Sequence, residues 1–253
     1  MSETEKIERI EADFENGAGP FADVTFPEER LLDTVATVLG DDGETVSLPM
    51  EDRLALVSAF ATFDYNRDAN QLVDNLLDLH EEDAKMFNAW HVNGEKELEY
   101  YFEDIGFRYP SRDAHAWATN CEILRNKYHG RWSELLLSVG CDAEALVERL
   151  NGDDFLCLKG VKIAPMYARI IDDEVCDLDN LWALDIPVDT HIRRLSNDLF
   201  ERFEGDDSTD DEIREIWRIY GTRHDINRHV VDGALWHIGN KWDEWGEEYW
   251  NNV

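Results

Sequence analysis

The chain has few basic residues, and lysine is especially scarce. Only 24 of its 253 residues are lysine or arginine, seven of them lysine, against 57 aspartates and glutamates, and the formal net charge is −33. Because most nucleic-acid-binding proteins are basic, this balance argues against a broad electrostatic surface for nucleic acid. The acids are scattered among apolar residues, which excludes an acidic tail. An acidic, lysine-poor surface over an ordinary core suggests a protein that works in concentrated salt.

Cysteine and long apolar runs are also lacking. The four cysteines stand at 121, 141, 157 and 176, with no Cys-x-x-Cys pair and no histidine-rich spacing, so we expect reduced thiols, a cytoplasmic protein and no metal site. No apolar run approaches the length that spans a membrane, and the acidic start does not resemble a signal peptide. The sequence therefore predicts no membrane partner.

Aromatic residues, by contrast, are plentiful. Nine tryptophans, eleven phenylalanines and eight tyrosines, with 43% hydrophobic residues overall, predict a packed interior and exclude disorder. Apolar residues recur at spacings of three and four, which indicates an all-α fold. Helices are expected over 28–39, 51–79 with a break at 62–68, 97–128 with a stop at Gly106, 165–171, 188–199, 210–220 and 230–238.

Two short segments organise the rest of the chain. Residues 158–164 read Leu-Lys-Gly-Val-Lys-Ile-Ala, a tight hairpin that leads into a helix. Residues 186–191 read Ile-Pro-Val-Asp-Thr-His, a proline stop followed by an aspartate at a helix start. The spacing of Val188, Ile192, Leu195 and Leu199 places these four side chains on one buried stripe of that helix.

Together these segments resemble the helix-hairpin-helix base-excision glycosylases, the endonuclease III superfamily. That family has a Leu-x-Gly-x-Gly hairpin before a helix with a catalytic lysine, and a later Val-Asp-x-His that carries the catalytic aspartate. Residues 188–191 match the second motif, and 158–161 match the start of the first. Residues 58–62, Ser-Ala-Phe-Ala-Thr, resemble the family's Ser-Ala-Gln-Ala-Thr, with Phe60 in place of the glutamine. The resemblance covers roughly residues 50 to 240.

The resemblance implies that Asp189 is the catalytic carboxylate. Cleavage of an N-glycosidic bond develops positive charge on the sugar, which a nearby carboxylate stabilises, or the carboxylate activates the attacking water or amine. An aspartate before a helical run also caps the helix by accepting amide hydrogen bonds. The two roles are compatible.

The position of the catalytic lysine has two alternatives. With a hairpin two residues shorter than usual, Lys162 occupies it, and its amine can attack the sugar carbon and form a Schiff base. Without a gap, Lys162 falls on the second hairpin glycine and Ala164 falls on the lysine position. In that case the chain is a monofunctional glycosylase or inactive.

The remaining site residues follow from the same resemblance. Hairpin amides and the following helix start can hold a DNA phosphate, so the expected DNA contacts are Leu158, Lys159, Gly160, Val161, His191 and Arg193. The candidates for a pocket that receives the damaged base are Phe60, Tyr65 and Trp236, and each has core packing as its alternative role.

The expected architecture is a two-lobed helical fold with the active-site cleft between the lobes. Residues 1–50 form an arm on the second lobe, 51–170 a six-helix lobe that ends in the helix-hairpin-helix, and 171–253 the second lobe with the aspartate helix and an aromatic C-terminus. Many family members carry four cysteines after this point for an iron–sulfur cluster. This chain has none after 176, so no cofactor is expected.

The resemblance thus implies a monomeric DNA-repair glycosylase that excises a damaged base from double-stranded DNA, with abasic-site lyase activity if Lys162 is the nucleophile. Two alternatives stay open. One is a DNA-binding protein that has kept the fold and lost catalysis, and the other is an N-glycosidase that acts on a nucleotide or on RNA.

Overall fold

The computed structural model describes residues 2–38, 47–64, 67–200 and 208–253. These residues form helices and no strand, apart from an isolated bridge between Asp142 and Asp179. The all-α prediction is confirmed. The chain divides into two compact units, which we call the larger unit (Thr25–Leu181) and the smaller unit (Met1–Val24 with Trp182–Val253).

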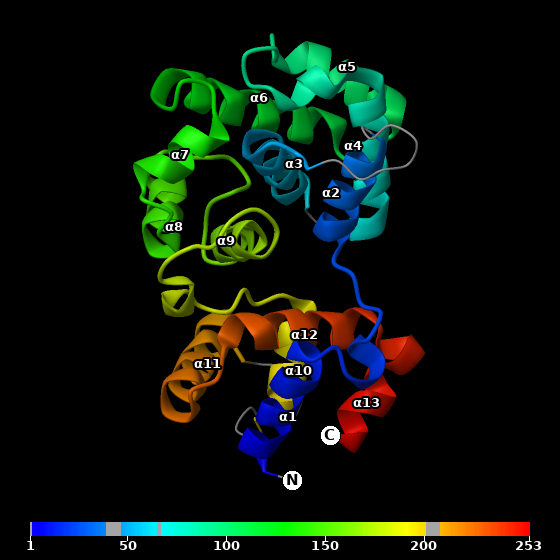
Figure 1. Ribbon diagram of the computed structural model, residues 1–253, viewed down its shortest axis with the longest axis vertical. Coiled ribbons are helices and arrows are strands. Elements are labelled where there is room, and N and C mark those ends of the chain that lie inside the picture. The colour runs from blue at the N-terminus through cyan, green and yellow to red at the C-terminus, as the bar shows by residue number, and fades with distance from the viewer. Residues whose placement is uncertain (1, 39–46, 65–66, 201–207) are drawn as a thin grey trace. The chain divides into compact units, whose positions relative to one another are not determined.

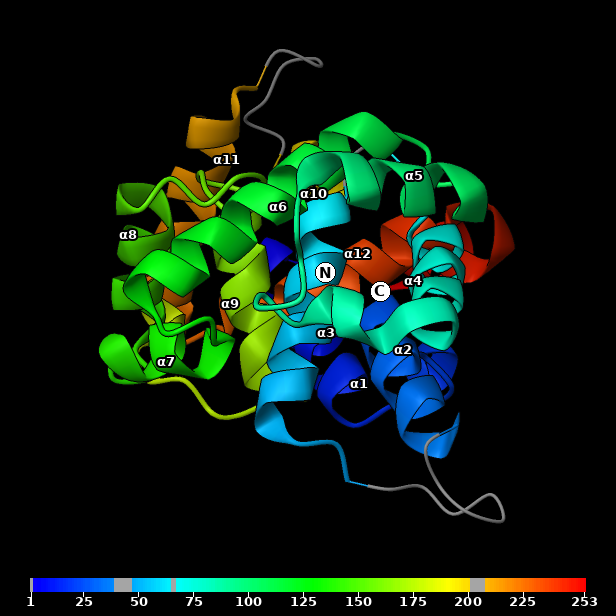
Figure 2. The same cartoon turned by 90° about the horizontal axis from the view of Figure 1, so that it is seen from above.

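The larger unit is built around one central helix (Figures 1 and 2). Its elements are α2 (Pro27–Val38), α3 (Met50–Phe63), α4 (Ala69–Asp83), the 3-10 turn η3 (Ala84–Phe87), α5 (Glu95–Ile105), α6 (Pro110–Lys127), α7 (Trp132–Ser138), α8 (Ala143–Gly152) and α9 (Ile163–Glu174). Helix α3 packs against α2, α4, α6, α7 and α9. Ten consecutive residues of α3, from Leu54 to Phe63, are buried. A helix that is apolar on all sides must lie inside its domain, which explains the central place of α3.

Local signals set where these helices begin and end. Asp68 caps α4 by accepting the amide of Gln71 at 3.0 Å. Helix α5 ends at Gly106, as the sequence predicted. The φ of Gly106 is +89°, a left-handed conformation that glycine adopts at little energetic cost. Pro110 opens α6, where the missing amide proton is not needed.

A buried ion pair joins α9 to α2 within this unit. Arg169 Nη2 lies 3.1 Å from Glu28 Oε1, and both side chains are less than a tenth exposed. Arg169 Nη1 also pairs with Asp173 at 2.9 Å. Removing one partner of such a pair leaves an uncompensated buried charge, so the two residues hold α2 and α9 together.

The same region gives Glu174 an unusual titration. Burial, together with the neighbouring carboxylates of Glu28, Glu29 and Asp173, raises the pKa of this half-buried carboxyl to about 7. The folded chain therefore holds a proton between pH 4.5 and about 7 that the unfolded chain has lost. The stability contributed by this group is present below pH 4.5 and is lost as the pH rises through about 7.

We expect Glu174→Gln to be more stable than the parent at pH 8 by about 1 kcal/mol, a few degrees in Tm, because the neutral amide avoids burying a charge. At pH 5 the two proteins should differ little. Thermal unfolding at both pH values measures this, with Glu148→Gln on the exposed face of α8 as the control. A pH-independent difference would show that Glu174 is ionised throughout.

The smaller unit joins the two ends of the chain. Its elements are α1 (Glu3–Glu15), the 3-10 turns η1 (Gly19–Phe21) and η4 (Leu181–Ala183, of which Leu181 belongs to the larger unit), α10 (Thr190–Leu199), α11 (Asp210–His224), α12 (Arg228–Asn240), the π-helical turn η5 (Trp242–Gly246) and α13 (Glu247–Asn252). Helix α12 packs against α1, α10 and α11 (Figure 1).

The core of the smaller unit contains the predicted stripe of α10. Val188, Ile192, Leu195 and Leu199 are all buried together with Trp217 and Trp250. Trp242, Trp245 and Tyr249 pack against this core as partly buried side chains. The C-terminal aromatics therefore close the unit by packing.

The units divide the chain at other points than those expected from the sequence. The expected boundaries follow residues 50 and 170, whereas the units divide after Val24 and Leu181. Helix α2 belongs to the larger unit because it packs on α4, α3 and α9. The stretch after α9 also stays there, since Asp179 N donates to Cys141 O at 2.9 Å and Asp179 O accepts from Ala143 N at 2.9 Å.

Candidate functional site

Helices α8 and α9 pack against each other and are joined by a ten-residue turn, 153–162. The side chain of Leu158 is fully buried and anchors the turn, so it presents no side-chain surface to a ligand. Lys159, Gly160, Val161 and Lys162 are exposed, and Val161 reaches 64% exposure. The predicted hairpin is therefore anchored by the buried Leu158, and its exposed residues 159–162 form a tip that protrudes from the surface.

Two asparagines that no sequence motif marks, Asn120 and Asn151, hold this turn. Asn120 in α6 is fully buried and clamps Leu156 from both sides, since Asn120 Nδ2 donates to Leu156 O at 2.9 Å and Asn120 Oδ1 accepts from Leu156 N at 2.7 Å. Asn151 at the end of α8 accepts from Gly160 N at 2.7 Å. Their signal in the sequence is weak, because a polar residue on an apolar helix face only indicates some buried partner.

The backbone conformation of the tip explains why position 160 is glycine and position 162 is not. Gly160 has a φ of +94°, in the region that favours glycine, whereas Lys162 has a φ of −107° and serves as the N-cap residue of α9. Position 162 therefore needs no glycine. Within the described residues, the amides of Val161, Lys162 and Ile163 meet no acceptor. Such amides at a helix start favour an anion.

The two candidate positions for the nucleophile differ in exposure. The Lys162 side chain is exposed and forms no hydrogen bond or ion pair with any described residue. Ala164 is fully buried. Lys159, in contrast, pairs with Asp154 at 2.7 Å, and this hydrogen bond lowers the pKa of the Asp154 carboxyl.

Arginines gather beside the turn. Asp113 is fully buried, and its carboxylate forms ion pairs with Arg67 Nη2 at 2.6 Å and with Arg112 Nη1 at 3.0 Å. Arg112 Nη2 also lies 3.1 Å from Cys157 Sγ, at the base of the tip. Nε and Nη1 of the buried Arg67 side chain have no acceptor among the residues that the structure describes. Two cations around one carboxylate leave this part of an acidic protein locally positive.

Asp189 lies in the smaller unit, at the N-cap of α10. Its Oδ1 accepts the amides of His191 and Ile192, each at 2.8 Å, which confirms the capping role. Its Oδ2 accepts no hydrogen bond from a described residue, and the residue is half-buried. One carboxylate oxygen is thus fixed by the helix and the other is unengaged.

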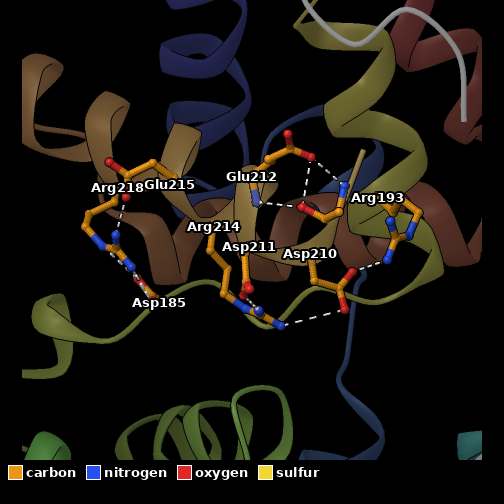
Figure 3. A network of polar contacts seen from close by, with 9 residues as sticks. Asp185, Arg193, Asp210, Asp211, Glu212, Arg214, Glu215 and Arg218 are labelled. Atoms are coloured by element: carbon orange, nitrogen blue, oxygen red, sulfur yellow. Dashed lines mark hydrogen bonds and ion pairs between the residues drawn. The ribbon is translucent and has the colours of Figure 1, made fainter. Parts of the chain in front are cut away.

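The other two expected DNA contacts, His191 and Arg193, lie on α10 and have different partners. Arg193 pairs with Asp210 and donates to Ser208 O, as Figure 3 shows for the first of these. Arg214 meets Asp210 and Asp211 in the same network (Figure 3). The charge of Arg193 is therefore offset by carboxylates of α11. His191 is half-buried and packs against Gly239 of α12.

Gly239 sets how closely α10 and α12 approach. A Cβ added there would lie 2.6 Å from Cγ of His191, closer than real contacts allow. We expect Gly239→Ala to lower the free energy of unfolding by about 1–3 kcal/mol through overpacking. At a free helix position the same change would raise it by about 0.5–1 kcal/mol.

Denaturant unfolding measures this difference, and Gly152→Ala is the matched control. Gly152 ends α8, and nothing lies within 4 Å of an added Cβ. A Gly239→Ala protein as stable as the parent would show that α10 can shift away from α12 without cost.

The three base-pocket candidates do not share one environment. Phe60 is 3% exposed inside α3 and packs in the core, which was its alternative role. Trp236 on α12 is half-buried, with its ring centroid 5.0 Å from that of His237. Tyr65 lies outside the described residues. Phe60 belongs to the larger unit and Trp236 to the smaller one.

Comparison with known proteins adds no assignment, since no family model and no curated protein matches the chain. Among the described residues, no three histidine, cysteine, aspartate or glutamate side chains are grouped so as to bind a metal ion. The helices that the structure describes are all too short or too polar to cross a membrane.

Proposed function

We propose that the protein is a base-excision DNA glycosylase of the helix-hairpin-helix type, and that its two units correspond to the two lobes of that fold. The observation that carries the proposal is the pairing of two features in one all-α chain. The first is a protruding turn with unengaged amides before α9, and the second is a helix-capping aspartate with one unengaged oxygen in a Val-Asp-Thr-His segment.

The turn is assigned to the DNA backbone. Its unengaged amides and the start of α9 suit a phosphate, which carries no sequence information and only positions the duplex. Lys162 adds a positive charge at the tip that no described residue pairs with, and Arg112, which pairs with Asp113, lies at its base. A locally positive turn in a chain of net charge −33 is what a phosphate contact requires.

Asp189 is assigned to the bond that breaks. Because Oδ1 is held by two amides, the carboxylate has a fixed orientation, and Oδ2 is left to face the positive charge that develops on the sugar. The base leaves with the bonding electron pair, and water or an amine adds to the sugar carbon.

The acidic surface is compatible with this assignment in concentrated salt. At about 1 M salt the Debye length falls to about 3 Å, so distant carboxylates repel DNA little. Counterion release also contributes less, and binding rests on hydrogen bonds to phosphate, stacking and base extrusion.

A second candidate is a protein that binds DNA through the turn without excising a base. The burial of Phe60, at the position where the family has a glutamine near the extruded base, favours it. Base release separates the two candidates, because only the first breaks a bond.

The deciding experiment is a panel of duplexes, each with one oxidised, alkylated or mismatched base, incubated with the full chain in about molar salt. Release of the free base from at least one duplex is expected. Binding to duplex DNA without release from any member would favour the second candidate, and competition by free nucleotides in place of duplex would indicate a nucleotide N-glycosidase.

A further inference from the structure

A separate cavity lies in the larger unit, among the start of α3, η3 and residues 129–134. Its volume is about 750 Å³, within the range of small-molecule sites. It is lined by α3 residues such as Glu51, Ala55 and Leu56 and by none of the residues of the 153–162 turn. The proposed glycosylase chemistry does not use it.

Trp90 gives the cavity a fixed aromatic wall. Its indole Nε1 donates to His129 O at 3.1 Å, and its backbone amide donates to Asn88 Oδ1 at 2.9 Å. A Cβ added to Gly130 would lie 2.6 Å from Cε2 of the indole, so the ring rests directly on that glycine. Arg125 holds the same loop by donating to Ala89 O and to Val92 O.

Although it is held in place, Trp90 is 60% exposed. Its only polar atom is already bonded, so what the ring can still offer a ligand is its π face. A rigid aromatic face is a stacking platform for a planar ring, and stacking costs little entropy when the platform does not have to be ordered.

The charged groups around Trp90 indicate the rest of the ligand. Lys85 and Arg131 line the cavity, and their side chains form no hydrogen bond or ion pair with any described residue. Both side chains are exposed and can therefore meet an anion that enters the cavity. Both belong to the cavity wall that also contains Trp90.

The acids of the wall divide into two kinds. Glu51 is fully engaged, because its carboxylate accepts Trp132 N at 2.8 Å, Ser133 N at 2.9 Å and Ser133 Oγ at 2.5 Å. Asp52 and Glu134 have no hydrogen-bond partner among the described residues and can accept hydrogen bonds from ring amino groups.

From this combination we infer that the cavity binds a planar heteroaromatic ring with N–H donors and an anionic group, the chemistry of a purine nucleotide. The ring stacks on Trp90, the anion meets Lys85 and Arg131, and amino groups of the ring meet Asp52 or Glu134. The site is independent of the turn and of Asp189.

Isothermal titration calorimetry of the full chain with adenosine 5′-monophosphate tests this inference. Adenosine supplies the ring without the anion, inorganic phosphate supplies the anion without the ring, and 2-naphthoate supplies an aromatic anion without N–H donors. We expect the nucleotide to bind more tightly than any of the three. Trp90→Ala should weaken nucleotide binding at least about fivefold by removing the stack, and Trp90→Phe should retain most of it.

The charge variant Lys85→Gln/Arg131→Gln should bring the affinity for the nucleotide down to that for adenosine. Trp182→Ala is the matched control, since Trp182 is 74% exposed in the smaller unit and should not affect binding. The inference would be overturned if the nucleotide did not bind at about millimolar concentration. It would also be overturned if the Trp90→Ala variant and the charge variant both bound the nucleotide with the affinity of the parent. Equal affinity for 2-naphthoate would remove the nucleotide assignment. Base release from DNA should be unchanged in all these variants.

Discussion

Asp189→Asn should reduce base release by about 10²–10⁴-fold, the range expected when a carboxylate that stabilises a developing cation or acts as a base is neutralised. The change is nearly isosteric. Asparagine is as good a helix N-cap as aspartate, so the amides of His191 and Ile192 keep their acceptor and α10 should keep its place. Single-turnover base release from the best duplex of the panel measures the effect.

The control for this variant is Asp68→Asn, the same substitution at the N-cap of α4, where Asp68 accepts from Gln71 N. It should leave base release unchanged. DNA affinity should persist in Asp189→Asn, because the phosphate contacts are assigned to the 153–162 turn. Base release that survives in Asp189→Asn at the parent rate would refute the assignment of Asp189 as the catalytic carboxylate.

The spacing of apolar residues predicted helices correctly where a helix has one apolar face. The sequence predicted the stripe of α10 from Val188 to Leu199, and all its members are buried. It also predicted the stop at Gly106, since glycine after an apolar run is typical of a left-handed helix end. The same patterns placed α2, α11 and α12 to within a few residues.

Features that depend on contacts between distant residues could not be predicted. Helix α1 lies in an acidic N-terminal segment with few apolar residues. It is stabilised by Ile7 and Ile10, which pack on a core more than 170 residues away in sequence, and by Lys6 Nζ, which donates to Trp250 O at 2.6 Å. The clamp from Asn120 to Leu156 is likewise a contact between distant residues. The spacing of apolar residues indicates which face of a helix is buried, but not which distant segment packs against that face.

The site was predictable in its parts. The cap at Asp189 and the exposed tip at Lys159–Lys162 follow from local turn and cap chemistry. The engagement of Arg193 by Asp210 does not, because an exposed arginine in an acidic chain has many possible partners.

Lys162→Ala should abolish the covalent adduct that borohydride traps on abasic-site DNA. In the proposed lyase step the Nζ lone pair attacks the aldehyde carbon of the open sugar, water leaves, and the resulting imine is reduced by hydride to a stable amine. Lys162→Arg should also give no adduct, because guanidinium keeps the positive charge but is not a nucleophile at neutral pH. Gel electrophoresis after trapping in high salt measures both variants.

Lys159→Ala is the matched control. Lys159 is on the same exposed tip, three residues earlier, but is paired with Asp154. The adduct should persist in this variant, and duplex affinity should fall by a similar small amount in Lys159→Ala and Lys162→Ala, because each removes one cation from the tip. An adduct that persists in Lys162→Ala would show that another amine reacts.

The two candidate positions differ in what they could supply to a lyase step. Ala164 is fully buried and has no amine, so an alignment that puts position 164 at the nucleophile leaves the turn without covalent chemistry. Lys162 has a side chain with no competing partner, directly before α9. If the parent chain itself gives no adduct while still releasing a base, Asp189 must direct water instead, and the protein is a monofunctional glycosylase whose hairpin lysine serves only the phosphate.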